Sequence, residues 1–140
     1  MNLRNSILGW LGALFGSPAA TTEQEPLSPP NAPVAFTSIT VVNKPPANHE
    51  VGEGKLYCVF AADKPKRTLF LCPCGCGSVV TLSLQSVHRP HWRLTKTLAG
   101  HPTLYPSIWR DTGCLSHFWL RGGRIAWCRD TGRHPDRRYD

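Results

Sequence analysis

Three cysteines fall within a single short stretch of the chain, FLCPCGCG at residues 70–77. Cys72, Cys74 and Cys76 are each separated from the next by one residue. Disulfides between them are disfavoured, because a disulfide requires a specific separation of its two Cα atoms. Thiolates gathered on a turn are instead typical ligands of a soft metal ion, and four sulfur or nitrogen ligands in tetrahedral geometry suit Zn²⁺. The stretch therefore predicts a structural zinc site.

The other half of the site must come from further along the chain. It is made either of Cys114 with Cys128 or of Cys114 with His117 in a C-x2-H arrangement. The pattern is similar to a zinc knuckle, although C-x-C and C-x3-C replace the usual C-x2-C, so the binding subset stays open. Buried or disulfide-bonded cysteines are the alternative, and Cys58 in an apolar segment is interpreted as core. The candidate zinc ligands are Cys72, Cys74, Cys76, Cys114 and Cys128.

A second group of reactive side chains lies in HPTLYPSIWRDTGCLSHFW, which holds Ser107, Asp111 and His117. A serine nucleophile needs a histidine base and a group that orients the histidine. Asp111 is the obvious carboxylate, since residues 54–128 contain only one other acid, Asp63. The spacing equally suits a serine that caps a turn and a histidine that binds zinc.

The charge balance indicates a further class of function. The formal net charge is +7, and tryptophans lie among the basic residues of 54–128. Basic residues interleaved with aromatic ones on a small β domain can bind single-stranded nucleic acid through charge and stacking. The same surface suits an acidic protein partner.

Several short segments rich in β-branched and aromatic residues must position these groups. The alternation and the turn residues between segments predict strands at 55–62, 67–73, 78–84 and 91–98. FTSITVVN at 36–43 can form another strand, and FWLRGGRIAWC predicts a hairpin that turns at Gly122-Gly123. Only TLYPSIWRDTG, residues 103–113, suggests a helical turn.

These segments predict a mainly β fold, a small zinc-stabilised domain of zinc-ribbon-like hairpins with CPCGCG at one turn. So few residues in short strands bury little core, which favours a metal as a staple. The predicted organisation is an N-terminal apolar segment with a flexible Pro-rich linker at 1–53, the zinc-binding β domain at 54–129, and a basic disordered tail at 130–140.

The first residues contain an apolar run at 7–15 after Arg4. Its outline is that of a signal peptide, but its spacing also fits a short amphipathic helix that contacts a partner or a membrane surface. The run is too short to cross a bilayer as a helix. We favour the amphipathic helix and a cytoplasmic protein with reduced thiols.

The order of four motifs, FLCPCGCG, HWRL, HPTLYPSIW and GCLSHFWLRGGRIAWC, resembles a bacterial family of domains of unknown function. Some of its members carry the label ammonia monooxygenase, which nothing in this sequence supports. Members lie beside genes for bacterial ubiquitin-like proteins and their activating and conjugating enzymes, and the family has been suggested to supply the peptidase of those pathways.

The resemblance implies a serine-type peptidase or isopeptidase that processes a ubiquitin-like protein. It implies that Ser107 is the nucleophile and His117 the general base, with Asp111 or a backbone carbonyl orienting the histidine, while the cysteines hold structural zinc. The ubiquitin-like protein and its conjugating enzymes are then the expected partners. The competing class is a non-catalytic zinc module that binds protein or nucleic acid.

Overall fold

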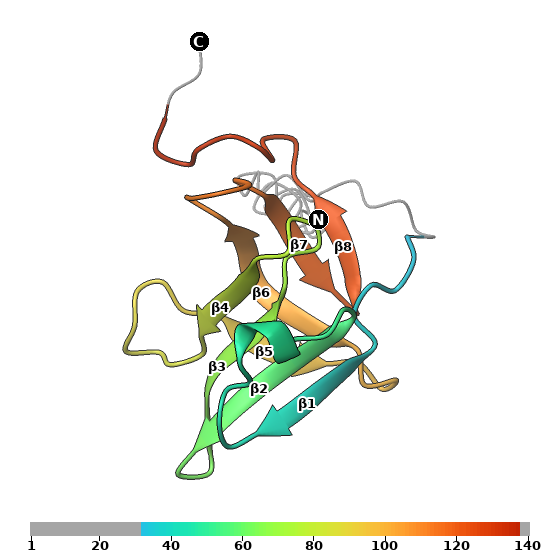
Figure 1. Cartoon of the computed structure of the whole chain (residues 1–140), viewed down its shortest axis with the longest axis vertical. Helices are drawn as coiled ribbons and strands as arrows, with labels where there is room; N and C mark the ends of the chain where they lie inside the picture. Colours follow the sequence, from blue (N-terminus) through green and yellow to red (C-terminus); the bar gives the residue numbers. More distant parts are fainter. Residues whose placement is uncertain (1–31, 138–140) are drawn as a thin grey trace, which may run out of the picture.

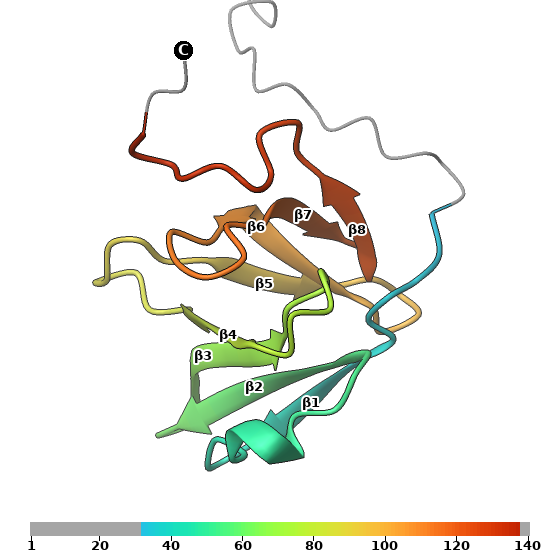
Figure 2. The same ribbon diagram turned by 45° about the horizontal axis from the view of Figure 1, so that its top comes forward.

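A computed structural model describes residues 32–137 and shows a mainly β protein built of two four-stranded sheets (Figure 1). The first sheet has the strand order β1-β2-β3-β4 and the second β5-β6-β7-β8. Figure 2 shows the two sheets as two layers. The strands are β1 (Ser38–Val42), β2 (Lys55–Ala61), β3 (Lys64–Leu71), β4 (Val79–Ser83), β5 (Arg93–Lys96), β6 (Pro102–Trp109), β7 (His117–Arg121) and β8 (Arg124–Trp127).

The first sheet positions the cysteine-rich turn. Strands β3 and β4 form an antiparallel hairpin that closes with the pair Leu71 and Val79, so that CPCGCG makes up the connection as the sequence predicts. Gly75 and Gly77 have φ of 87° and 79°. These left-handed conformations are open to glycine at little cost, and they allow the chain to reverse repeatedly within a few residues.

The second sheet is an antiparallel meander that carries the segment 102–127. Its last hairpin turns at Gly122-Gly123, where φ is 55° and 77°, and Arg121 pairs with Arg124 across the turn. Two consecutive positive φ values are characteristic of a two-residue hairpin turn, so the prediction from the Gly-Gly pair is confirmed.

The core lies between the two sheets and receives alternate side chains from both. Phe70 and Phe118 are fully buried, and their rings meet edge to face with centroids 6.4 Å apart. Phe36, which precedes β1, packs edge to face on Phe70 with centroids 5.4 Å apart. The buried cluster comprises Phe36, Leu56, Phe70, Cys72, Val80, Leu82, Leu104, Ile108, Phe118 and Leu120.

One predicted element is wrong. Residues 103–113 were expected to contain a helical turn, but residues 102–109 form strand β6. Leu104 and Ile108 have a spacing that fits one face of a helix, and this spacing is also even, which places both on one face of a strand. Pairing with β5 on one side and β7 on the other decides in favour of the strand.

The folded region also extends beyond the predicted boundaries of 54 and 129. Strand β1 lies within the expected strand at 36–43 and pairs in parallel with β2, so this part of the segment assigned to the linker at 1–53 belongs to the first sheet. At the other end, Asp130 to Arg133 are held by hydrogen bonds described below. The predicted N-terminal apolar helix lies outside the described residues. Within residues 32–137, no helix is long and apolar enough to cross a membrane.

Candidate active site

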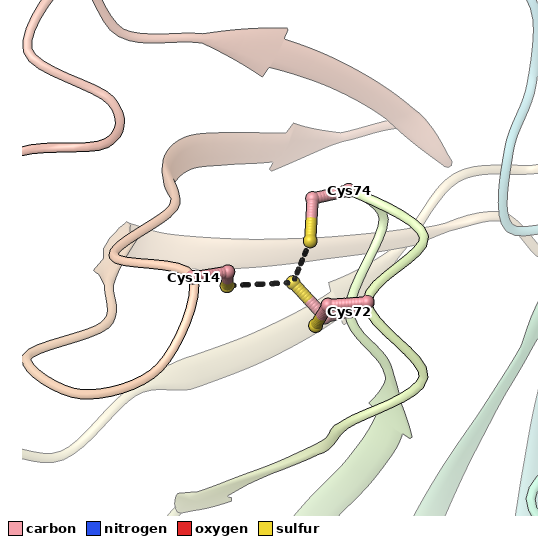
Figure 3. Close-up of side chains that lie close together, drawn as sticks. Cys72, Cys74 and Cys114 are labelled. Atoms are coloured by element: carbon pink, nitrogen blue, oxygen red, sulfur yellow. Dashed lines mark hydrogen bonds between the residues drawn. The ribbon is translucent and has the colours of Figure 1, made fainter.

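Four cysteines meet where the β3–β4 turn approaches the loop between β6 and β7. One ligand atom of each lies within 4.8 Å of the others, and Figure 3 shows three of the side chains pointing toward one another. The Sγ of Cys72 lies 3.4 Å from that of Cys74 and 3.7 Å from that of Cys114. A tetrahedron with Zn–S distances of 2.3 Å has edges of about 3.8 Å. The cluster of Cys72, Cys74, Cys76 and Cys114 therefore fits a tetrahedral metal ion.

Donors around the sulfurs suit a cluster of thiolates. The Oγ of Ser116 donates to the Sγ of Cys114 at 3.1 Å, and the guanidinium of Arg110 lies 3.5 Å from the same sulfur and 3.7 Å from that of Cys76. Hydrogen bonds from Ser78 lower the pKa of Cys76 to about 6. Burial raises the pKa of Cys72 to about 12, so that a positive ion is the natural means of keeping all four sulfurs as thiolates.

Cys128 and His117, the other predicted ligands, do not join this cluster. Cys128 lies instead beside His117 and Asp130, with one ligand atom of each within 4.8 Å of the others. Burial, followed by the charge of Asp130, raises the pKa of the Cys128 thiol. The structure thus selects Cys114 without Cys128 as the second half of the cysteine cluster.

Ser107 lies in an irregular part of β6. Leu104 pairs with Leu120 and Ile108 pairs with Phe118, so the stretch 105–107 lies opposite the single residue Trp119. Extra residues in one strand form a bulge, which redirects side chains and is frequent beside active sites. The carbonyl of Ser107 accepts a hydrogen bond from Trp92 Nε1 at 3.2 Å. The bulge is therefore anchored to the residue that precedes β5.

Ser107 and His117 meet across the two strands. The Ser107 Oγ lies 3.0 Å from His117 Nε2, and His117 Nδ1 lies 2.6 Å from Asp130 Oδ1. An ionised carboxylate only accepts hydrogen bonds, so the proton of the neutral imidazole belongs on Nδ1. Nε2 then accepts the hydroxyl proton of Ser107. The three side chains are arranged as a nucleophile, a base and an orienting acid.

The imidazole is also held from one face. The rings of His117 and Trp109 stack with centroids 4.2 Å apart and an interplanar angle of 2°. Trp109 Nε1 donates to the carbonyl of Arg133 at 2.9 Å. The histidine side chain retains 13% of its exposure, against 42% for Asp130. The imidazole of His117 is thus fixed by a ring on its face and by partners at both nitrogens.

The segment after β8 completes this arrangement by folding back over the start of β7. Thr131 Oγ1 accepts from the His117 amide at 3.0 Å, Gly132 N donates to the carbonyl of Leu115 at 2.9 Å, and Cys128 N donates to the carbonyl of His117 at 2.9 Å. These bonds place Asp130 beside the ring. The first residue of the segment expected to be a disordered tail is therefore ordered and contacts His117.

Asp111, the predicted orienting acid, is exposed in the loop after β6, and His117 Nδ1 is bonded to Asp130 instead. Asp130 lies just beyond residues 54–128, the range in which Asp111 is the obvious carboxylate. The turn at Gly122-Gly123 offered a signal. In an antiparallel hairpin, the end of the second strand lies beside the start of the first strand. Residues just beyond β8 must therefore lie beside His117, the first residue of β7.

The cysteine cluster and the serine–histidine pair share one loop. Cys114 precedes His117 by three residues, and Arg110, which touches two of the sulfurs, follows Ser107 by three. Arg110 N also donates to the carbonyl of Ser116 at 2.9 Å. A metal bound to Cys114 would therefore fix the loop whose two ends lead into the strands that carry Ser107 and His117.

A protein-family model agrees with this chemistry. The family described as bacterial ubiquitination-like system serine protease (BubE) matches residues 41–128, which is more than half of the chain. The chain therefore belongs to the BubE family, as its motifs indicated. No curated protein and no solved structure matches it. The matched range contains Ser107 and His117 and ends just before Asp130.

Proposed function

We propose that this BubE-family chain is a serine peptidase or isopeptidase that hydrolyses the bond after the C-terminus of a ubiquitin-like protein. Ser107 is the nucleophile, His117 the general base, and Asp130 the acid that orients it. The proposal rests mainly on the continuous hydrogen-bonded path from Ser107 Oγ through the His117 imidazole to the Asp130 carboxylate, in which the two distances are 3.0 and 2.6 Å. The family description supports the pathway, and the ubiquitin-like protein with its conjugating enzymes are the proposed partners.

The geometry supports a two-step reaction. His117 Nε2 takes the hydroxyl proton as Ser107 Oγ attacks the scissile carbonyl, and the same proton passes to the departing amine. Water then attacks the acyl-serine and loses a proton to Nε2, which passes it to the departing Ser107 Oγ as the new carboxylate is released. Asp130 keeps Nδ1 protonated and stabilises the positive imidazolium of each transition state. No step requires the cysteines.

The cysteine cluster is proposed to hold a structural Zn²⁺. Four thiolates fill a tetrahedral site and leave no position for a catalytic water, in contrast to catalytic zinc sites with three protein ligands. The ion would connect the β3–β4 turn to the loop that ends at His117. Thiolate ligation of this kind also favours a reducing compartment such as the cytoplasm.

The test is cleavage of a fusion in which a short peptide extends the C-terminus of a ubiquitin-like protein encoded beside the gene. Ser107→Ala and His117→Ala should each abolish cleavage while leaving zinc content and the unfolding temperature unchanged. The double variant should be scarcely worse than either single one, because the two residues act as a unit. Cleavage by Ser107→Ala at the wild-type rate would overturn the proposal.

A further inference from the structure

Arginine and aromatic side chains form a row on the second sheet, spread over three strands. Arg93 of β5 lies over the ring of Tyr105 at 5.5 Å, and Tyr105 of β6 contacts Trp119 of β7 with centroids 5.9 Å apart. Arg121, also on β7, lies over the ring of Trp119 at 4.4 Å. We call these four residues the arginine–aromatic row.

The row lies beside the serine–histidine pair on the same face of the sheet. His117 and Trp119 are two residues apart on β7, so their side chains point to the same side. Two residues of strand span about 7 Å. Tyr105 and Ser107 belong to the same bulge, whose residues lie opposite Trp119. A substrate bound with its scissile carbonyl at Ser107 would place a neighbouring residue over the row.

The chemistry of the row favours a negatively charged group. Arg93 and Arg121 are exposed and carry fixed positive charges, and Tyr105 keeps 48% of its exposure. Trp119 is nearly buried, at 7% exposure, and supports the exposed members of the row from beneath. A guanidinium restrained on an aromatic face loses less freedom when it binds a carboxylate, because its planar donors are already oriented.

We propose that the arginine–aromatic row is a substrate subsite that recognises an acidic residue close to the scissile bond. This rests on the proposed function, since it takes Ser107 as the reacting group. The row then acts in specificity and takes no part in proton transfer. It favours substrates that place a carboxylate about 7 Å from the attacked carbonyl.

Two reactive probes test the subsite without knowledge of the natural substrate. Both are fluorophosphonates that label an activated serine, and they differ only in an arm of about 7 Å that ends in aspartate or in the neutral asparagine. A guanidinium about 7 Å from the probe carboxylate, with the interaction screened as in water, changes the labelling rate about threefold. Wild-type protein should therefore label faster with the aspartyl probe, by about threefold for each arginine that engages it.

Variants assign the preference to the row. Arg93→Gln should lower the aspartyl-to-asparaginyl rate ratio about threefold, Arg93→Glu should lower it further, and Arg93→Lys should largely retain it. Arg121→Gln should act in the same direction as Arg93→Gln. Arg67→Gln, which removes an exposed arginine from β3 of the other sheet, is the matched control and should leave the ratio unchanged. Labelling of Arg67→Gln by the asparaginyl probe should stay within twofold of the wild type, because Arg67 lies outside the row and Ser107 and His117 are untouched.

The outcomes separate the two proposals. If Ser107 reacts with both probes at equal rates whatever the charge at position 93, the subsite is wrong and the proposed function stands. If neither probe labels Ser107, the proposed function fails and the subsite fails with it. Protection of Ser107 from the asparaginyl probe by a single-stranded oligonucleotide at low salt would reassign the row to nucleic-acid phosphates and overturn the acidic subsite.

Discussion

Replacing Asp130 tests the contact between its carboxylate and His117, which the sequence motifs did not predict. The Asp130 carboxylate bonds His117 Nδ1 at 2.6 Å and faces the positive charge that the imidazole gains in the transition state. Opposite unit charges about 4 Å apart attract by about 1 kcal/mol in water and by about 4 kcal/mol at the effective permittivity of a protein surface. Because the Asp130 side chain is 42% exposed, solvent screening places the value between these limits.

The expected loss follows from this range. Asp130→Ala should lower kcat/KM by about fivefold to several hundredfold, since about 1.4 kcal/mol corresponds to a factor of ten. Asp130→Asn should be at least as damaging. Its amide can donate to Nδ1, which would move the imidazole proton to Nε2 and leave no acceptor for the Ser107 hydroxyl.

The assay is cleavage of the C-terminally extended ubiquitin-like fusion, with zinc content and thermal unfolding measured on each variant. Asp111→Ala is the matched control, because it removes an exposed acid from the neighbouring loop and should retain wild-type activity. Asp130→Asn within twofold of the wild type, or an equal loss in Asp111→Ala, would refute the assignment of Asp130 as the orienting acid.

Three further predictions concern the metal, the C-terminal segment and the stacked ring. Cys76→Ser should lose bound zinc and unfold at a lower temperature, whereas Cys128→Ser should keep one zinc per chain by elemental analysis, because only the former lies in the cluster; equal zinc loss in both would contradict this ligand set. A chain ending at Arg129 should lack cleavage activity and one ending at Arg137 should retain it, since Asp130 lies between the two ends; activity in the shorter chain would contradict the role of this segment. Trp109→Leu should lower kcat/KM about threefold to tenfold through loss of the stack on the histidine, while Trp109→Phe should keep most of it; identical kinetics in the two variants would show that stacking does not matter.

Much of the fold follows from local patterns in the sequence. The cysteine-rich turn was predictable because its glycines permit left-handed backbone and because the flanking segments alternate, and both features are found between β3 and β4. The last hairpin was predictable from Gly122-Gly123 and the apolar segments on either side of this pair. Strand β6 was not, because the spacing of Leu104 and Ile108 is compatible with both periodicities and only pairing with neighbouring strands resolves it.

The candidate site was predictable only in part, for a related reason. Ser107 and His117 lie in neighbouring strands, so their proximity depends on the bulge in β6, which leaves no mark in residue spacing. Asp130 stands in a segment with almost no apolar residues and owes its place to backbone hydrogen bonds. The composition of the segment after residue 129 predicts disorder, although hydrogen bonds to His117 and Leu115 hold it in place.

Covalent labelling of Ser107 tests the central claim most directly. Wild-type protein should react with a simple fluorophosphonate to give one adduct per chain, and peptide mapping by mass spectrometry should place the adduct on Ser107. His117→Ala should retain its zinc and fold but react far more slowly, because the imidazole no longer accepts the hydroxyl proton. A protein that cleaves its ubiquitin-like fusion while Ser107 remains unmodified, or after Ser107→Ala, would contradict the account.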